Sequence, residues 1–123
     1  MAHPQPADAP PADRQVQLYA IWDAEMRARL RPLATDEVIA EHARNPLGQH
    51  TEPLARLLNY FRRVPQAGKY VIVNTQPHRE WQIAILSGRR GVPPAPIPGA
   101  VYSSWETAIH GVFVRRVEDL KRG

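Results

Sequence analysis

The 123-residue sequence has no cysteine, no long run of apolar residues and none of the glycine-rich motifs that cradle phosphate groups. Without cysteine, neither a disulfide framework nor a thiolate metal site can form, and nothing indicates an oxidising compartment. The first 12 residues have no basic start and no apolar segment, so they resemble neither a signal peptide nor a membrane span. We therefore expect a cytoplasmic protein that does not enter the membrane.

Proline, in contrast, is frequent, with 13 residues in the chain. Residues 1–12 are rich in proline and alanine, and we expect them to form a disordered tail. Residues 13–123 have the length of one domain with a single hydrophobic core. The formal net charge of +4 suits an acidic partner, which could be nucleic acid, an anionic lipid surface or another protein.

Three helices are predicted in the first half of the chain, over residues 13–31, 36–44 and 52–64. Proline cannot continue a helix and pushes the preceding residue away from helical geometry, so it marks where each helix ends. These ends are at Pro32, at the Asn45-Pro46 pair and at Pro65. The candidate N-cap residues are Asp13 for the first helix, Thr35 or Asp36 for the second and Thr51 for the third.

Two of these helices carry an apolar stripe at three- and four-residue steps, which predicts the face that each turns to the core. The stripe of the first helix is Leu18, Tyr19, Trp22, Met26 and Leu30, and that of the third is Leu54, Leu57, Leu58, Phe61 and Val64. The third helix has the clearer pattern, so we expect the rest of the chain to pack around it.

After Gly68 the apolar period changes to two, which is typical of strands. Residues 70–73 and 81–85 predict an antiparallel hairpin, with Trp81, Ile83 and Ile85 on the face that meets the helices. Residues 88–99 contain four prolines and three glycines, so we expect a surface loop there and not an inner strand. Residues 100–102 fit a short third strand at the edge of the sheet.

The last helix is predicted to begin at a Ser103 and Glu106 capping box. Its expected buried stripe is Trp105, Ile109, Val112, Phe113, Val117 and Leu120. Gly111 lies inside this helix, where glycine costs about 1 kcal/mol relative to alanine, so we expect another backbone to approach closely there. The predicted fold class is therefore α+β, with three N-terminal helices, an antiparallel hairpin and a C-terminal helix.

The sequence shows no grouping of residues that would form an active site or a metal site within this chain. His42, His50 and His110 have no spacing typical of metal ligands. The serines fit turns and caps, and the acidic residues lie where helices and strands ordinarily carry solvated charge. We therefore assign no catalytic residue and no metal ligand, and a self-contained hydrolase is the least favoured function.

One basic and aromatic stretch could form a binding surface. It consists of Tyr60, Phe61, Arg62 and Arg63, with Lys69, Tyr70, Arg79, Arg89 and Arg90 further along the chain. Nucleic-acid binding would need exposed aromatic rings for stacking, whereas Phe61 belongs to the apolar stripe. Tyr60 and Arg62 at its flank suit a protein interface at least as well. From the residues alone, a merely solvated basic face is equally compatible.

Four blocks of the sequence together resemble a known family. They are EHARNPLG at residues 41–48, NYFR at residues 59–62, EW with IA at residues 80–84, and HGVFVRRVED at residues 110–119. In this order and spacing they are similar to the small (alpha, or light) subunit of N,N-dimethylformamidase. The chain departs from that family at Leu47, where the family has an aromatic residue, in its proline-rich residues 92–98 and in its N-terminal tail.

The resemblance implies an accessory subunit of an enzyme that hydrolyses dimethylformamide to formate and dimethylamine. It further implies a large catalytic subunit as partner, in an α2β2 assembly, with a mononuclear iron held by tyrosines and a glutamate of that large subunit. No cofactor is then expected in this chain. The residues expected at the interface are Asn45, Pro46, Tyr60, Arg62, Arg63, His110, Arg115 and Arg116. The alternative function is a small basic nucleic-acid-binding module.

Overall fold

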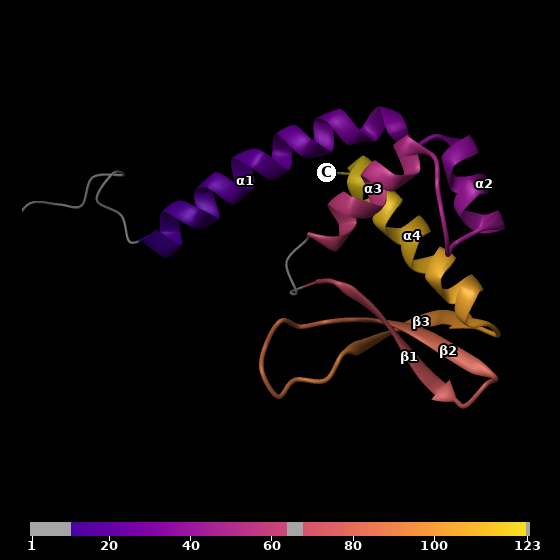
Figure 1. Cartoon of the computed structure of the whole chain (residues 1–123). Helices are drawn as coiled ribbons and strands as arrows, with labels where there is room; N and C mark the ends of the chain where they lie inside the picture. Colours follow the sequence, from indigo (N-terminus) through magenta and orange to yellow (C-terminus); the bar gives the residue numbers. More distant parts are fainter. Residues whose placement is uncertain (1–10, 64–67, 123) are drawn as a thin grey trace, which may run out of the picture.

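The computed structural model describes residues 11–63 and 68–122, which form four α-helices and one three-stranded sheet (Figure 1). The helices are α1 (Pro11–Leu30), α2 (Asp36–Arg44), α3 (Glu52–Arg62) and α4 (Trp105–Arg122), with a 3-10 turn, η2 (Arg31–Leu33), after α1. The strands are β1 (Tyr70–Gln76), β2 (Glu80–Ile85) and β3 (Ala95–Tyr102). The predicted α+β class, with three N-terminal helices, a hairpin and a C-terminal helix, is confirmed.

The sheet is antiparallel with the order β1-β2-β3, so β2 is its central strand. Ile72 of β1 lies opposite Ile83 of β2, and Trp81 of β2 lies opposite Tyr102 of β3. The third strand is longer than predicted because it begins at Ala95, inside the proline-rich segment that we expected to be a loop. Its prolines are compatible with a strand since β3 lies at the edge of the sheet, where a missing N–H breaks no ladder.

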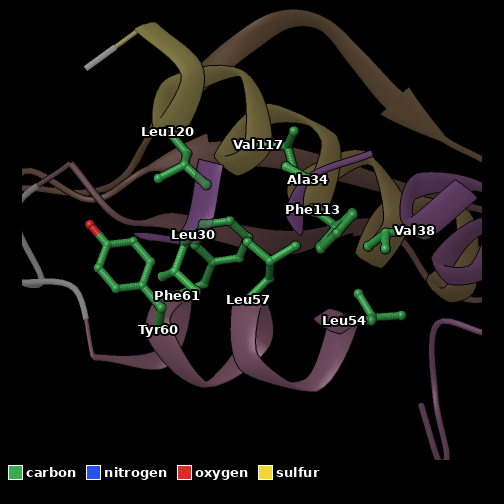
Figure 2. Packing of buried hydrophobic residues seen from close by; sticks show 10 residues of the cluster. All are labelled: Leu30, Ala34, Val38, Leu54, Leu57, Tyr60, Phe61, Phe113, Val117 and Leu120. Carbon is green, nitrogen blue, oxygen red and sulfur yellow. The ribbon is translucent and has the colours of Figure 1, made fainter. Parts of the chain in front are cut away.

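The main core lies between α3 and α4, where side chains from both helices and from the end of α1 meet (Figure 2). Leu54, Leu57 and Leu120 are completely buried, and Leu30 is 1% exposed. The predicted stripe of α3 is confirmed at Leu54, Leu57 and Phe61, whereas Val64 lies outside the described residues. Burying a leucine side chain contributes about 1.5–3 kcal/mol, so this cluster is the main source of stability.

A second apolar cluster joins α4 to the sheet. It consists of Ile83, Ala100 and Val112, with Tyr70, Ile72, Ile97 and Tyr102 packed against them. Helix α4 therefore takes part in both clusters, and Figure 1 shows it running from the helical layer down to the sheet. Helix α4 therefore connects the helical layer to the sheet.

Helix α1 departs from the predicted stripe. Trp22 and Met26 pack against the main core, but Leu18 is 65% exposed. Val16 and Ile21 are also exposed, and Figure 1 shows the N-terminal part of α1 extending away from the other elements. The prediction of a buried Leu18 is wrong because no element packs beside that part of the helix among the described residues.

The predicted helix ends are confirmed only in part. The Thr35 hydroxyl accepts a hydrogen bond from the backbone N–H of Val38, 3.3 Å away, so Thr35 caps α2, and α2 ends at the Asn45-Pro46 pair as expected. Helix α4 is capped by Ser104, whose hydroxyl accepts from the Thr107 N–H at 3.1 Å, and not by Ser103. The side chain of Asp13 and the tail at residues 1–10 lie outside the described part of the structure.

Two predictions about side chains of α4 also need correction. Trp105, expected in the buried stripe, is 44% exposed because it is the first residue of the helix and lies beyond the edge of the core. Gly111 is closely approached, as predicted, but by a side chain and not by a backbone. A Cβ atom at this position would overlap the phenol ring of Tyr102.

Candidate partner interface

Three histidines that are distant in sequence come together where α2 meets α4. The Nδ1 atoms of His42 and His110 lie 2.9 Å apart, and the His42 ring stacks on Phe113 with centroids separated by 4.2 Å. The His50 ring also stacks on His42, with centroids 6.1 Å apart, and its Nε2 atom contacts the backbone oxygen of Asn45 at 2.7 Å. No sequence pattern indicates this cluster, because its members lie on separate elements.

Burial lowers the pKa of His42 to about 4, and the neighbouring His110 and His50 add to this shift. Burial also lowers the pKa of His110. Both imidazoles are therefore neutral at pH 7, and one Nδ1 donates its proton to the other. Within the described residues, no group of three or more histidine, aspartate or glutamate side chains is arranged to hold a metal ion.

A half-open, mostly apolar cleft lies beside this cluster, between α3, α4 and β1. Its volume is about 250 Å³. Its lining residues are His42, Leu58, Phe61, Tyr70, Val71, Ile72, Trp105, Ile109, Val112, Phe113 and Arg116. The sequence did not indicate that Trp105 and Ile72 line a cleft. The apolar period of an element predicts which face is buried, but not where two layers stand apart.

Arg116 is the charged residue that lines this cleft. Its guanidinium carbon lies 5.9 Å from the centre of the Phe61 ring, in cation–π contact. Its Nε atom is buried and has no hydrogen-bond partner among the described residues. Burial lowers the pKa of Arg116, partly offset by Tyr70.

Arg115, the neighbour of Arg116 in sequence, is held by bonds within the chain. One of its guanidinium nitrogens donates to the Tyr102 hydroxyl at 2.9 Å and to the backbone oxygen of Gly111 at 3.2 Å. A second hollow, between α4 and Tyr102, is lined by Arg115, His110 and Glu106 among others. Adjacent arginines therefore differ: one is bonded within the chain, and the other lacks a partner for its Nε atom among the described residues.

Two tyrosine hydroxyls, one from a buried and one from a partly buried side chain, connect the helices to one another and to the sheet. The Tyr60 hydroxyl donates to the Asp23 carboxylate, and the Tyr70 hydroxyl donates to the Asp119 carboxylate at 2.6 Å. Burial, strengthened by these hydrogen bonds to carboxylates, raises the pKa of both tyrosines to about 12. Arg27 and Arg122 also bond to Asp119, through its backbone oxygen and its carboxylate respectively.

The structure divides the residues predicted at the interface. His110, Arg115 and Arg116 line the two hollows of α4, while Asn45, Arg62 and Arg63 are exposed at helix ends. Pro46 is half-buried. Tyr60 differs, because it is 4% exposed and belongs to the main core. Because Tyr60 and Phe61 are both buried, neither ring is available for base stacking, and this part of the nucleic-acid alternative loses its basis.

The geometry defines a small α+β domain with an apolar cleft on one side, and no described helix is long and apolar enough to cross a membrane. The family model for the N,N-dimethylformamidase alpha subunit matches residues 17–123. The chain belongs to this family. It is 35% identical to the N,N-dimethylformamidase alpha subunit of Alcaligenes sp, over 89% of this chain and 85% of that protein. It is 33% identical to the corresponding alpha subunit of Paracoccus aminophilus, over 89% and 79% of the two chains.

Proposed function

We propose that this chain is the small, non-catalytic subunit of an amide hydrolase of the dimethylformamidase type. The enzyme would hydrolyse dimethylformamide, or a related small amide, to formate and the amine. The observation that carries this proposal is the family membership, since two alpha subunits of dimethylformamidase match over most of their own length. Catalysis then belongs to a large partner subunit in a hetero-oligomer of the α2β2 type, in the cytoplasm.

Three carboxylates of this chain take part in structural hydrogen bonds. Glu41 accepts two hydrogen bonds from Thr51, and Asp23 and Asp119 each accept one from a tyrosine hydroxyl. A general base must be free to accept a proton from water or substrate. These three carboxylates instead connect helices to one another or to the sheet, so their role is structural.

The proposed metal site is assigned to the same subunit as catalysis. We place the iron on the large subunit, where it would polarise the amide carbonyl and activate water. His42 and His110 do not offer their Nδ1 atoms to such a site, because these two atoms face each other at 2.9 Å. They serve the packing of α2 on α4.

The proposal is tested by assaying dimethylformamide hydrolysis with the small chain alone, the large subunit alone and the co-expressed complex. We expect the small chain alone to be inactive and the complex to be active. Turnover by the pure small chain at a rate comparable with that of the complex would overturn the proposal. Binding to nucleic acid that falls steeply with salt and needs no protein partner would instead favour the alternative function.

Metal analysis of the complex tests where the iron is held. His50→Gln and His110→Gln change imidazoles that are not part of the main core, and we expect the iron content per large subunit to stay the same. As a control, the unchanged stoichiometry of the two chains shows that the complex is intact. Loss of iron from an intact complex would show that this chain contributes a ligand.

The proposed interface with the large subunit includes seven of the residues expected from the sequence. They are Asn45, Pro46, Arg62, Arg63, His110, Arg115 and Arg116. We leave Tyr60 out because its ring is buried in the core of the small chain itself. A change at Tyr60 would therefore destabilise the fold and could not report on the interface.

A further inference from the structure

We propose that the cleft between α3, α4 and β1 is the docking site for a segment of the large subunit that carries a carboxylate next to an apolar side chain. This inference rests on the proposed function, because it takes the large subunit as the partner. It adds the place and the chemistry of the contact. Three observations lead to this proposal. They are the size of the cleft, the lack of a hydrogen-bond partner for the Arg116 guanidinium among the described residues, and the exposure of Trp105 at the mouth of the cleft.

The cleft is smaller than the usual pocket for a drug-sized ligand and has room for side chains of a protein. Pockets for drug-sized molecules have volumes of roughly 300–1,000 Å³, whereas this cleft measures about 250 Å³ and is half-open. Phe61, Ile72 and Ile109 supply an apolar lining. An aliphatic or aromatic side chain entering from a partner would remove this surface from water, which favours association.

Arg116 sets the charge that the partner must bring. Its Nε atom is buried without a hydrogen-bond partner, and no ion pair to it occurs within the described residues. The carboxylate of Asp119, three residues further along α4, is already bonded to Tyr70 and Arg122. A buried donor without an acceptor is unfavourable, and a carboxylate matches the guanidinium fork with two parallel hydrogen bonds. A partner cannot reach the buried Nε atom, but the terminal guanidinium nitrogens of Arg116, which lines the cleft, also make no hydrogen bond within the described residues. An aspartate or glutamate from outside the chain is the best acceptor for them.

The mouth of the cleft has the character of an interface. Trp105 lines the cleft and is 44% exposed. An exposed tryptophan suits an interface, because tryptophan is among the residues most enriched at binding hot spots. Strand β1, which forms one wall, pairs only with β2 in the described sheet and so has an unpaired edge. Natural proteins ordinarily cover or block such an edge. The large subunit is a better occupant than a second copy, since copies with a net charge of +4 repel each other.

The test compares binding of variants of this chain to the large subunit, with the dissociation constant as the measurement. Arg116→Gln leaves a carboxylate of the partner unpaired, and removing one member of a buried charge pair weakens binding by about 30-fold or more. We expect that loss here. Arg29→Gln is the matched control, because it removes the same charge from the exposed side of α1 and should bind as the unmodified chain does.

A second variant covers the case in which Arg116→Gln disturbs the fold through its contact with Phe61. Trp105→Ala shortens an exposed side chain at the mouth, and we expect binding to weaken about 30-fold or more, as for an interface hot spot. Thermal unfolding of each isolated variant shows whether the fold is intact. If every variant that folds binds as tightly as the unmodified chain, the docking site is elsewhere although the proposed function stands.

Two other outcomes would also overturn the inference. An unmodified chain that does not bind the large subunit at all would overturn both this inference and the proposed function. Sedimentation of the isolated chain would reveal a dimer, and a dimer that Arg116→Gln dissociates would make a second copy the occupant of the cleft. A monomer whose binding to the large subunit depends on Arg116 and Trp105 is the expected result.

Discussion

The Nδ1 atoms of His42 in α2 and His110 in α4 lie 2.9 Å apart, within hydrogen-bonding distance. With His42 stacked on Phe113, this contact fastens the short helix α2 to the helix that also carries the sheet. The bond requires that at least one Nδ1 atom stays unprotonated as the acceptor, because two protonated imidazoles would turn N–H groups and like charges toward each other. The packing of α2 therefore depends on pH.

We predict that the chain loses stability as the pH falls from about 6.5 toward 4. The pKa of His42 is about 4 in the folded chain, whereas a histidine in an unfolded chain has a pKa of about 6.5. In this window the unfolded chain therefore binds more protons than the folded chain. The contribution of His42 to the free energy of unfolding is thus fully present above about pH 6.5. It decreases on acidification, by on the order of 2 kcal/mol. The groups that surround His42 are His50, His110 and Glu41, and the lowered pKa of His110 acts in the same direction.

Urea unfolding at a series of pH values measures this effect. His78→Asn is a suitable control, since His78 is exposed, and asparagine tolerates its positive φ of 61°. The control should keep the same decrease in stability between about pH 6.5 and 4. A flat stability profile in the unmodified chain over this range would contradict the prediction.

Tyr70→Phe should destabilise the chain by about 1–2 kcal/mol, because it leaves the Asp119 carboxylate without the 2.6 Å hydrogen bond from β1. The ring itself is kept, so the packing of the sheet on α4 is preserved. The free energy of unfolding in urea is the measurement, and Tyr19→Phe, for which no hydrogen bond of the hydroxyl is found in the described residues, serves as the control. Equal stability of the two variants would show that the Tyr70 bond contributes nothing.

Gly111→Ala should destabilise the chain even though alanine favours helices by about 1 kcal/mol over glycine. The added methyl group would overlap the ring of Tyr102, whose hydroxyl is fixed by Arg115. Overpacking of this kind costs about 1–3 kcal/mol, which exceeds the gain in propensity. In a double-mutant cycle, Tyr102→Val should relieve most of the effect of Gly111→Ala. Additive effects of the two changes would speak against a direct overlap.

Glu41→Ala should loosen the turn that leads from α2 to α3. The Glu41 carboxylate accepts from the Thr51 N–H at 2.9 Å and from its hydroxyl at 2.6 Å, and these bonds lower the pKa of Glu41. We expect less protection of the Thr51 amide from hydrogen exchange, relative to an unstructured amide at the same pH, in the variant, and also in the unmodified chain once the pH falls low enough to protonate Glu41. Glu37→Ala, at an exposed position of the same helix, should leave this exchange rate unchanged.

Local signals in the sequence were sufficient for most elements. The break at Asn45-Pro46 and the cap of α2, which is Thr35 of the two predicted candidates Thr35 and Asp36, depend on neighbouring residues only. The start of β3 was missed because its prolines exclude an inner strand but permit an edge strand, and the order of strands is not a local property. The exposure of Leu18 was missed for a related reason, since a helical stripe is buried only where another element lies beside it.

The candidate site was predictable only in part. Arg116 was expected at the interface, on the basis of the block it shares with the family, and it lines the cleft. The cleft itself depends on how far α3 and β1 stand apart around α4, which no spacing in the sequence encodes. The contact between His42 and His110 was also unforeseen, as 68 residues separate the two rings along the chain.

The prolines of β3 have a consequence for how copies of this protein can assemble. Pro96 and Pro98 have no N–H groups, so this border of the sheet lacks donors that an incoming strand would need. Growth of a continuous fibril by strand addition requires that both edges of the sheet in every molecule can pair with a strand of a neighbouring molecule. The β3 border is therefore the weaker of the two borders for strand addition, which disfavours open-ended association through the sheet.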